Sequence, residues 1–189
     1  MEQNNSLEGQ LQDLYNQMYA NASVGNFWKN IPLAREALRL TKEEATESDR
    51  DDILQLSEWV VTQKLLLDYE TPRLVLAFME LWTDLSHDEQ RWAKEMQRLR
   101  RMIDPNTPED EKLELMTEGR FIKYDPIQLS EAWEENIYEV EKELDEEFKD
   151  TDRFMGFCHA YWSSKRAALA RRGIIWRSPA MMNPRTHFD

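Results

Sequence analysis

The stretch that decides the fold is LSEAWEENIYEVEKELDEEF, residues 129–148. Its apolar residues recur at steps of four, four, three, four and four, the spacing of one face of an α-helix. They are Leu129, Trp133, Ile137, Val140, Leu144 and Phe148. Asp125 and Pro126 precede the stretch as a helix start signal. We expect an amphipathic helix with one packed stripe and one charged face.

The rest of the chain repeats this helical pattern. Glycine is scarce, at five residues, and RFIKYDP (residues 120–126) is the one candidate for an extended piece. Further helices are predicted over about 6–18, 31–45, 48–67, 71–85, 86–103, 113–118 and 154–172, with Ser48 and a Ser86–Glu89 capping box as start signals. The sequence therefore predicts an all-α, single-domain bundle of about seven or eight helices over residues 1–189.

Two apolar clusters predict what the bundle buries. The third predicted helix is apolar around most of its circumference, so we expect it to lie at the centre of the bundle. Its apolar residues are Ile53, Leu56, Trp59, Val60, Val61, Leu65, Leu66 and Leu67. The C-terminal tail after Gly173 contains two prolines and cannot be one helix. Ile174, Ile175 and Trp176 are too apolar to stay in water, so we expect this irregular tail to dock.

Composition narrows the class of protein. The chain has 189 residues, of which 41% are hydrophobic and 11% aromatic. This length and composition are sufficient to form a hydrophobic core. A single cysteine excludes an internal disulfide framework and fits a reducing compartment. The most apolar run, LVLAFMELW (residues 74–82), is far shorter than the roughly 20 residues of a membrane helix. With no apolar leader at the N-terminus, we expect a soluble cytoplasmic protein that does not bind membranes.

The charge is divided unevenly along the chain, which has a net charge of −13. Residues 153–189 contain seven Lys/Arg and one Asp, a net charge of +6. The other 17 Lys/Arg and 36 Asp/Glu give residues 1–152 a net charge of −19. An acidic body repels nucleic acid and attracts basic partners.

The acidic residues of 131–152 fall mainly off the apolar stripe of that helix. They form either a solvated face or a docking surface for a basic protein, or a surface that imitates the charge of DNA. The candidate interaction face is Glu131, Glu135, Glu139, Glu143, Glu146 and Glu147. Crowding like charges on one face costs a few tenths of a kcal/mol per pair, a cost more readily tolerated when the face has a use.

The basic C-terminal segment offers a second candidate surface. It contains Lys165, Arg166, Arg171, Arg172 and Arg177. These side chains could stabilise the C-terminal end of their own helix and form ion pairs with the acidic body. Alternatively, they could contact another protein or a second copy of the chain, or they could bind nucleic acid. Trp162 and Trp176 fit core and tail anchors better than base-stacking platforms.

No motif predicts catalysis or a cofactor. Cys158 and His159 are neighbours on a helix and point about 100° apart, so we expect Cys158 to be a buried core thiol and not a nucleophile. With three histidines and no HExxH, HxxxH or CxxC pattern, no metal site is predicted. Glycine-rich phosphate loops and a GxSxG elbow are also absent from the sequence.

These observations predict a non-enzymatic protein that binds another protein through its acidic helical face, and a basic partner would complement the charge of that face. Inhibitor, immunity or accessory-subunit roles suit this class, and the Trp and Met content also suits a homo-oligomeric contact. Nucleic-acid binding through the basic segment is the alternative. The second alternative is an enzyme of a type that the sequence does not identify, with a pocket near Cys158, His159 and Tyr161.

Overall fold

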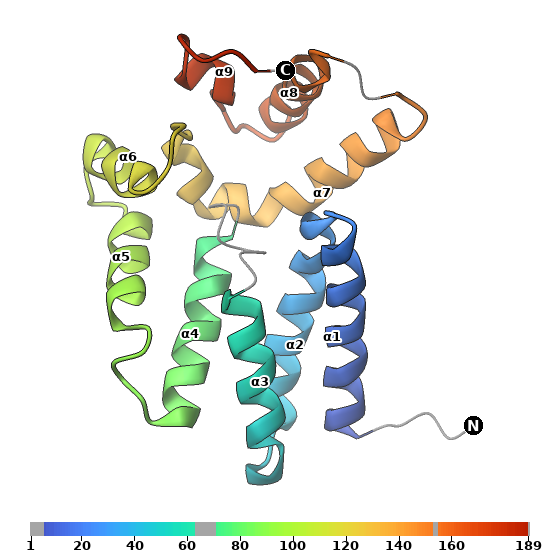
Figure 1. Ribbon diagram of the computed structural model, residues 1–189, viewed down its shortest axis with the longest axis vertical. Coiled ribbons are helices and arrows are strands. Elements are labelled where there is room, and N and C mark those ends of the chain that lie inside the picture. The colour runs from blue at the N-terminus through green and yellow to red at the C-terminus, as the bar shows by residue number, and fades with distance from the viewer. Residues whose placement is uncertain (1–5, 63–70, 153–154, 189) are drawn as a thin grey trace. The chain divides into compact units, whose positions relative to one another are not determined.

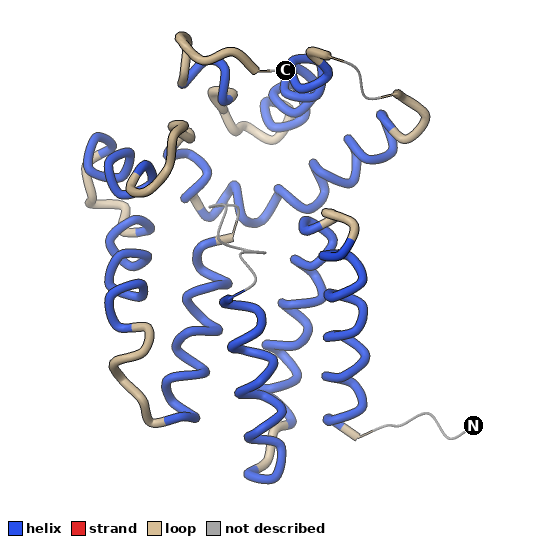
Figure 2. Tube along the Cα trace, in the orientation of Figure 1, coloured by secondary structure: helices blue, strands red, loops and turns tan. Residues whose placement is uncertain are grey.

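The structure is a computed structural model that describes residues 6–62, 71–152 and 155–188. Those residues form helices joined by loops and turns, without a β-strand (Figure 2). The helices are α1 (Leu7–Ser23), α2 (Asn30–Glu44), α3 (Arg50–Thr62), α4 (Pro72–Ser86), α5 (Ala93–Ile103), α6 (Glu109–Thr117), α7 (Glu131–Phe148), α8 (Phe157–Ala170) and α9 (Pro179–Met182). The all-α prediction is confirmed, and the expected extended piece at 120–126 is a loop.

The chain divides into two compact units, Met1–Arg100 and Arg101–Asp189. The division falls within α5, and each unit is described by itself below. The assignment of residues 1–189 to a single domain stays a prediction.

Unit 1 contains the four helices α1 to α4. Helix α1 packs against α2 and α3, and α4 packs against the same two helices, so the four close into a bundle. Figure 1 shows consecutive helices of this unit running in opposite directions, as short connections favour. The fully buried side chains of this bundle include Met18, Ile31, Ile53, Val60, Val75, Phe78 and Met79.

The helix starts in unit 1 agree only partly with the sequence signals. Ser6 caps α1 by accepting the Gly9 N–H at 3.3 Å, which agrees with the predicted start of this helix near residue 6. The predicted Ser48 cap is wrong, because Thr46 and Asp49 form a capping box around a 3₁₀ turn that leads into α3. The predicted Ser86–Glu89 box is also wrong. His87 takes a left-handed conformation (φ 58°) that ends α4, and α5 begins only at Ala93.

Unit 2 is built on α7 and α8, which pack against one another. Ser130 caps α7 by accepting the Trp133 N–H at 3.1 Å. Helix α8 ends at a Schellman motif, in which Gly173 (φ 77°) donates its N–H to Ala170 O and Ile174 donates to Leu169 O, both at 3.0 Å. The buried apolar residues of this unit include Met116, Leu129, Trp133, Ile137, Val140, Leu144, Leu169 and Ile174.

The C-terminal tail docks within unit 2. Trp176 is 5% exposed, and its ring centroid lies 5.9 Å from that of Trp133. Asn183 donates to Lys123 O and accepts from Lys123 N, both at 2.9 Å, which ties the tail to the loop before α7. The prediction for Ile175 is wrong: it is 77% exposed, because its neighbours on either side take the inward positions.

Leu65, Leu66, Leu67 and Phe154, which the sequence pattern places in helices, lie outside the described residues. In the part of the chain that the structure describes, every helix is too short or too polar to cross a membrane.

Candidate functional site

Helix α7 carries a row of exposed glutamates at i, i+4 spacing, which we call the α7 ridge. Residues four apart on a helix lie one above the other and form a continuous ridge. Its members are Glu131, Glu135, Glu139, Glu143 and Glu147. Glu146, the sixth residue of the predicted acidic face, is exposed beside the row.

Helix α8 covers the C-terminal end of the α7 ridge. Arg171 donates to Glu143 at 3.0 Å, and Arg172 donates to both oxygens of the same carboxylate. The hydrogen bond from Arg172 is the main cause that lowers the pKa of Glu143, followed by the charge of Arg172 and the bond from Arg171. One turn further on, Ser164 donates to Glu147 at 2.7 Å. Two guanidinium groups of this chain therefore already bind the ridge.

The N-terminal part of the α7 ridge carries weaker contacts. Glu135 is exposed, and no side chain in the described part of the chain pairs with it. Glu139 lies 3.9 Å from Lys142, with 55% and 62% of the two side chains exposed. Beside the row, Glu146 forms a similar exposed pair with Lys149. Exposed pairs of this kind contribute little energy, so these carboxylates can exchange partners readily.

Lys165 is not part of any exposed basic surface. Its ammonium lies 2.5 Å from Glu141, with each side chain 7% exposed, and Tyr161 donates a hydrogen bond to the same carboxylate. The Lys165 nitrogen also lies 5.2 and 5.4 Å from the ring centroids of Trp133 and Trp176. Glu141 was not among the residues predicted from the sequence to form a site. Its position four residues after Ile137, beside the apolar stripe, is the signal that could have found it.

Arg177 anchors the tail through two carboxylates. Its side chain donates to Asp125 at 2.8 Å and to Glu109 at 2.7 Å, and its backbone N–H donates to Asp125 at 2.6 Å. The hydrogen bond to Asp125, followed by the one to Glu109, raises the pKa of Arg177 above its ordinary value. Asp125 is 3% exposed and also caps the turn before α7.

Four residues of the predicted basic segment are thus engaged by acids within unit 2. They are Lys165, Arg171, Arg172 and Arg177. The fifth, Arg166, is exposed, and no ion pair is found for it among the described residues. These contacts reduce the number of cations that the segment can offer to a phosphate backbone, which disfavours the nucleic-acid alternative.

Cys158 differs from its prediction, since it is half-buried and not part of a sealed core. His159 is exposed, and its ring meets the edge of Trp162 at 5.5 Å, while Trp162 contacts Phe188 of the tail at 5.1 Å. Among the residues that the structure describes, no hydrogen bond or ion pair of the Cys158 or His159 side chain is found. Across the described ranges, no cluster of three or more His, Cys, Asp or Glu could hold a metal ion.

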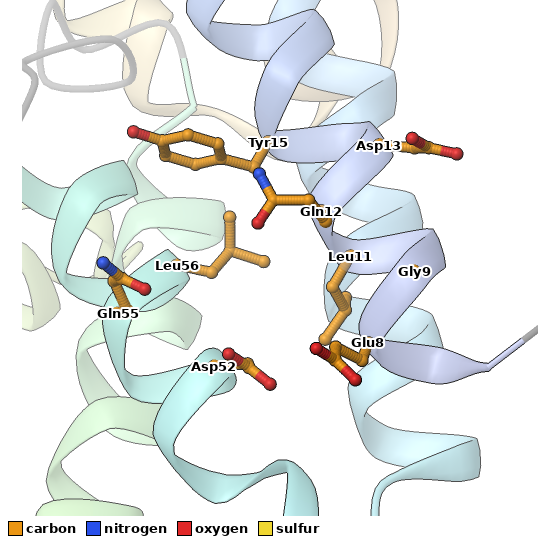
Figure 3. A pocket seen from close by; sticks show the side chains of 9 residues that line it. All are labelled: Glu8, Gly9, Leu11, Gln12, Asp13, Tyr15, Asp52, Gln55 and Leu56. Carbon is orange, nitrogen blue, oxygen red and sulfur yellow. The ribbon is translucent and has the colours of Figure 1, made fainter. Parts of the chain in front are cut away.

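A groove of about 460 Å³ lies in unit 1 between α1 and α3, and it was not predicted from the sequence. Its walls combine carboxylates, amides and apolar side chains (Figure 3). The lining residues are Glu8, Gly9, Leu11, Gln12, Asp13, Tyr15, Asp52, Gln55 and Leu56. No single pattern in the sequence joins them, because they come from helices more than 30 residues apart.

Comparison with known proteins gives no relative from which a role could be transferred: no family model, curated protein or solved structure matches the chain.

Proposed function

We propose that this protein is a non-enzymatic binding module that recognises a basic protein through the α7 ridge. The contact surface would centre on Glu131, Glu135 and Glu139, with Glu146 beside them. The exposed glutamates would bind arginine or lysine side chains of the partner.

The observation that carries the proposal is the binding of Arg171 and Arg172 to Glu143. Glu143 belongs to the same row as Glu139 and Glu135, and the row continues beyond the end of α8. Successive carboxylates of such a row are separated by about 6 Å along the helix axis. A partner that presents cations at a similar interval could therefore repeat, along the rest of the ridge, the contact that α8 already makes.

The charge of the molecule supports a basic partner. The net charge of −13 attracts cations at long range and raises the rate at which a basic protein meets the surface. Because exposed charges contribute modestly one by one, we expect an interaction that weakens as salt is added and that depends on several glutamates together.

The test is affinity capture from cell lysate with wild-type protein and with the triple variant Glu131→Gln/Glu135→Gln/Glu139→Gln. We expect basic proteins that resist nuclease treatment to be captured by the wild type and lost with the variant. A matched control, Glu89→Gln/Glu114→Gln/Asp110→Asn, removes the same number of charges at exposed positions that do not belong to the ridge.

The control should capture the same proteins as the wild type. If both variants lose them equally, the overall charge and not the ridge attracts them, and the proposed surface is wrong. If the captured material disappears with nuclease treatment, the nucleic-acid alternative takes its place.

A further inference from the structure

We propose that one surface of unit 2, which we call the tail patch, binds the headgroup region of a membrane that contains anionic lipids. The patch consists of Phe121 and Lys123 from the loop before α7 and of Ile175, Met181 and Arg185 from the C-terminal tail. The proposal goes beyond the α7 ridge and does not depend on it, since the two surfaces share no residue.

The tail patch forms where two segments far apart in the sequence are tied together. The Asn183 side chain bonds to the backbone N–H and to the carbonyl of Lys123, 60 residues away, at 2.9 Å each. The backbone N–H of Arg177 donates to Asp125 at 2.6 Å. Each apolar member of the patch lies two residues before Lys123, Arg177 or Asn183. The three apolar side chains therefore emerge from the same part of unit 2.

The apolar members of the tail patch are exposed to water. Phe121 is fully exposed, at 105%, and Ile175 and Met181 are exposed as well. A folded protein buries most of its large apolar side chains, and a group of exposed ones marks a surface that another molecule covers. Because the Phe121 ring stands clear of its neighbours, it can enter an apolar layer without a change in the fold.

The cationic members give the tail patch a positive charge. Lys123 and Arg185 are exposed, and no ion pair of either side chain is found among the described residues. The segments that carry the patch, residues 119–124 and 173–188, contain four Lys/Arg and no Asp/Glu, although the whole chain has a net charge of −13. Acids adjoin these segments only at their ends, as Glu118, Asp125 and Asp189. The patch therefore complements an anionic partner.

Neither exposed cations nor exposed apolar residues alone select this surface. Lys94 and Arg166 are exposed cations for which the described part of the chain offers no ion pair, but no large exposed apolar residue lies within four residues of either. Val24 and Phe27 are exposed apolar residues, but residues 19–28 around them carry no charge. The tail patch combines the two features.

This combination favours a lipid surface over nucleic acid. Proteins that bind in the membrane interface place apolar side chains at the boundary of headgroups and acyl chains, and lysine or arginine beside them binds anionic headgroups. Nucleic acid would engage the cations but leave Ile175 and Met181 in water, because side chains without a ring do not stack on bases. A bilayer covers both kinds of side chain, and it needs no pocket matched to Phe121.

The proposal departs from the expectation, drawn from the sequence, that the chain does not bind membranes. That expectation rested on the lack of a long apolar segment, and a patch assembled from residues 60 positions apart produces no such segment. The acids elsewhere in the chain weaken the contact only in part. At physiological salt, exposed charges more than about 8 Å from the lipid surface are largely screened.

Co-sedimentation of the full chain with lipid vesicles, at about 0.15 M ionic strength, tests the proposal. One set of vesicles contains equal parts of phosphatidylcholine and phosphatidylserine, and the other contains phosphatidylcholine alone. We expect the protein to bind the anionic vesicles and to bind the neutral ones much more weakly, because the two cations require anionic headgroups.

A pair of variants with equal net charge locates the cationic contact. Lys123→Gln/Arg185→Gln should bind the anionic vesicles at least roughly tenfold more weakly, whereas Lys94→Gln/Arg166→Gln should bind like the wild type. Asn183 bonds only to the backbone of Lys123, so substitution of the lysine side chain leaves that tie in place.

A second pair locates the apolar contact. Phe121→Ser should weaken binding roughly tenfold, because the ring is no longer buried in the interface. Met155→Ser removes another exposed apolar side chain of unit 2 that does not belong to the patch, and it should leave binding unchanged. Circular dichroism checks that both variants keep the fold.

Failure of the wild type to bind the anionic vesicles would overturn the proposal. So would equal weakening in both members of either pair, since binding would then depend on overall charge or overall hydrophobicity and not on the tail patch. Equal binding to neutral and anionic vesicles would contradict the role given to Lys123 and Arg185.

Discussion

Lys165 places its ammonium beside Glu141 in the interior of unit 2, where either charge alone would be costly. We predict that Lys165→Met lowers the free energy of unfolding by about 3–5 kcal/mol, because Glu141 is left buried without its cation. Urea denaturation followed by circular dichroism measures this change.

The double variant Lys165→Met/Glu141→Gln is the control for this prediction. It removes both charges and keeps an acceptor for Tyr161, so it should recover much of the lost stability. If the double variant is as unstable as the single one, packing and not the unpaired charge explains the loss.

Trp176 tests whether the tail contributes to the core of unit 2. Trp176→Ala should cost about 3–5 kcal/mol, the usual range for removing a large buried aromatic side chain. The adjacent Ile175 is 77% exposed, so Ile175→Ala should change the unfolding free energy by less than about 0.5 kcal/mol. Equal stability of Trp176→Ala and the wild type would mean that the tail is undocked in solution.

Glu143 makes the contact between α7 and α8 dependent on pH. Its pKa is lowered in the folded protein from 4.5, mainly by the hydrogen bond from Arg172. A lowered carboxyl pKa gives stability that is present above the unfolded pKa and is lost as the pH falls through the folded pKa.

The wild type should therefore melt higher than Glu143→Gln at neutral pH, and the difference should shrink as the pH falls below 4.5. Melting temperatures of the two proteins measured between neutral and acidic pH check this. A difference that grows on acidification would have the wrong sign for this ion pair.

At the scale of elements, the start of α7 depends on Ser130. Its hydroxyl satisfies the Trp133 N–H, so Ser130→Ala should cost about 1 kcal/mol, as for other N-cap serines. Ser48 is exposed and does not cap α3, so Ser48→Ala should stay within about 0.5 kcal/mol of the wild type. Chemical denaturation of both variants compares them, and a larger loss for Ser48→Ala would contradict the cap assignment.

The helices themselves could be predicted from the sequence because their evidence is local. The apolar stripe of 129–148 falls on the buried face of α7, and Pro72 marks the start of α4. The errors came where two local signals compete. Thr46, Ser48 and Asp49 can each serve a helix start, and the left-handed conformation of His87 ends α4 before the Ser86 hydroxyl can begin a new helix.

The contacts between elements could not be predicted in the same way. Lys165 and Glu141 are 24 residues apart, and Arg177 and Asp125 are 52 apart. Whether such residues meet depends on how α8 and the tail lie on α7, which the periodicity of a single helix does not specify. For the same reason the groove between α1 and α3 was missed, although a helix was predicted in each of the two places.

At the scale of the whole molecule, the uneven distribution of charge along the chain has two aspects: ion pairs within unit 2, and a negative surface that a partner could bind. The positive charge of residues 153–189 is largely matched by acids of unit 2, through Glu141, Glu143, Asp125 and Glu109. Elsewhere in the chain acids outnumber bases, and on the N-terminal half of the α7 ridge Glu139 makes only an exposed pair with Lys142, while no ion pair is found for Glu135 among the described residues. We infer that the negative surface, more than the basic segment, remains available to a partner.

The most direct test of the α7 ridge maps the amide chemical shifts of isotope-labelled protein during titration with a helical peptide that carries arginines at i, i+4 spacing. The largest shifts should cluster on α7 between Glu131 and Glu139, and they should disappear in Glu135→Gln/Glu139→Gln. Shifts spread evenly over the acidic residues, or unchanged in that variant, would contradict a binding site on the ridge.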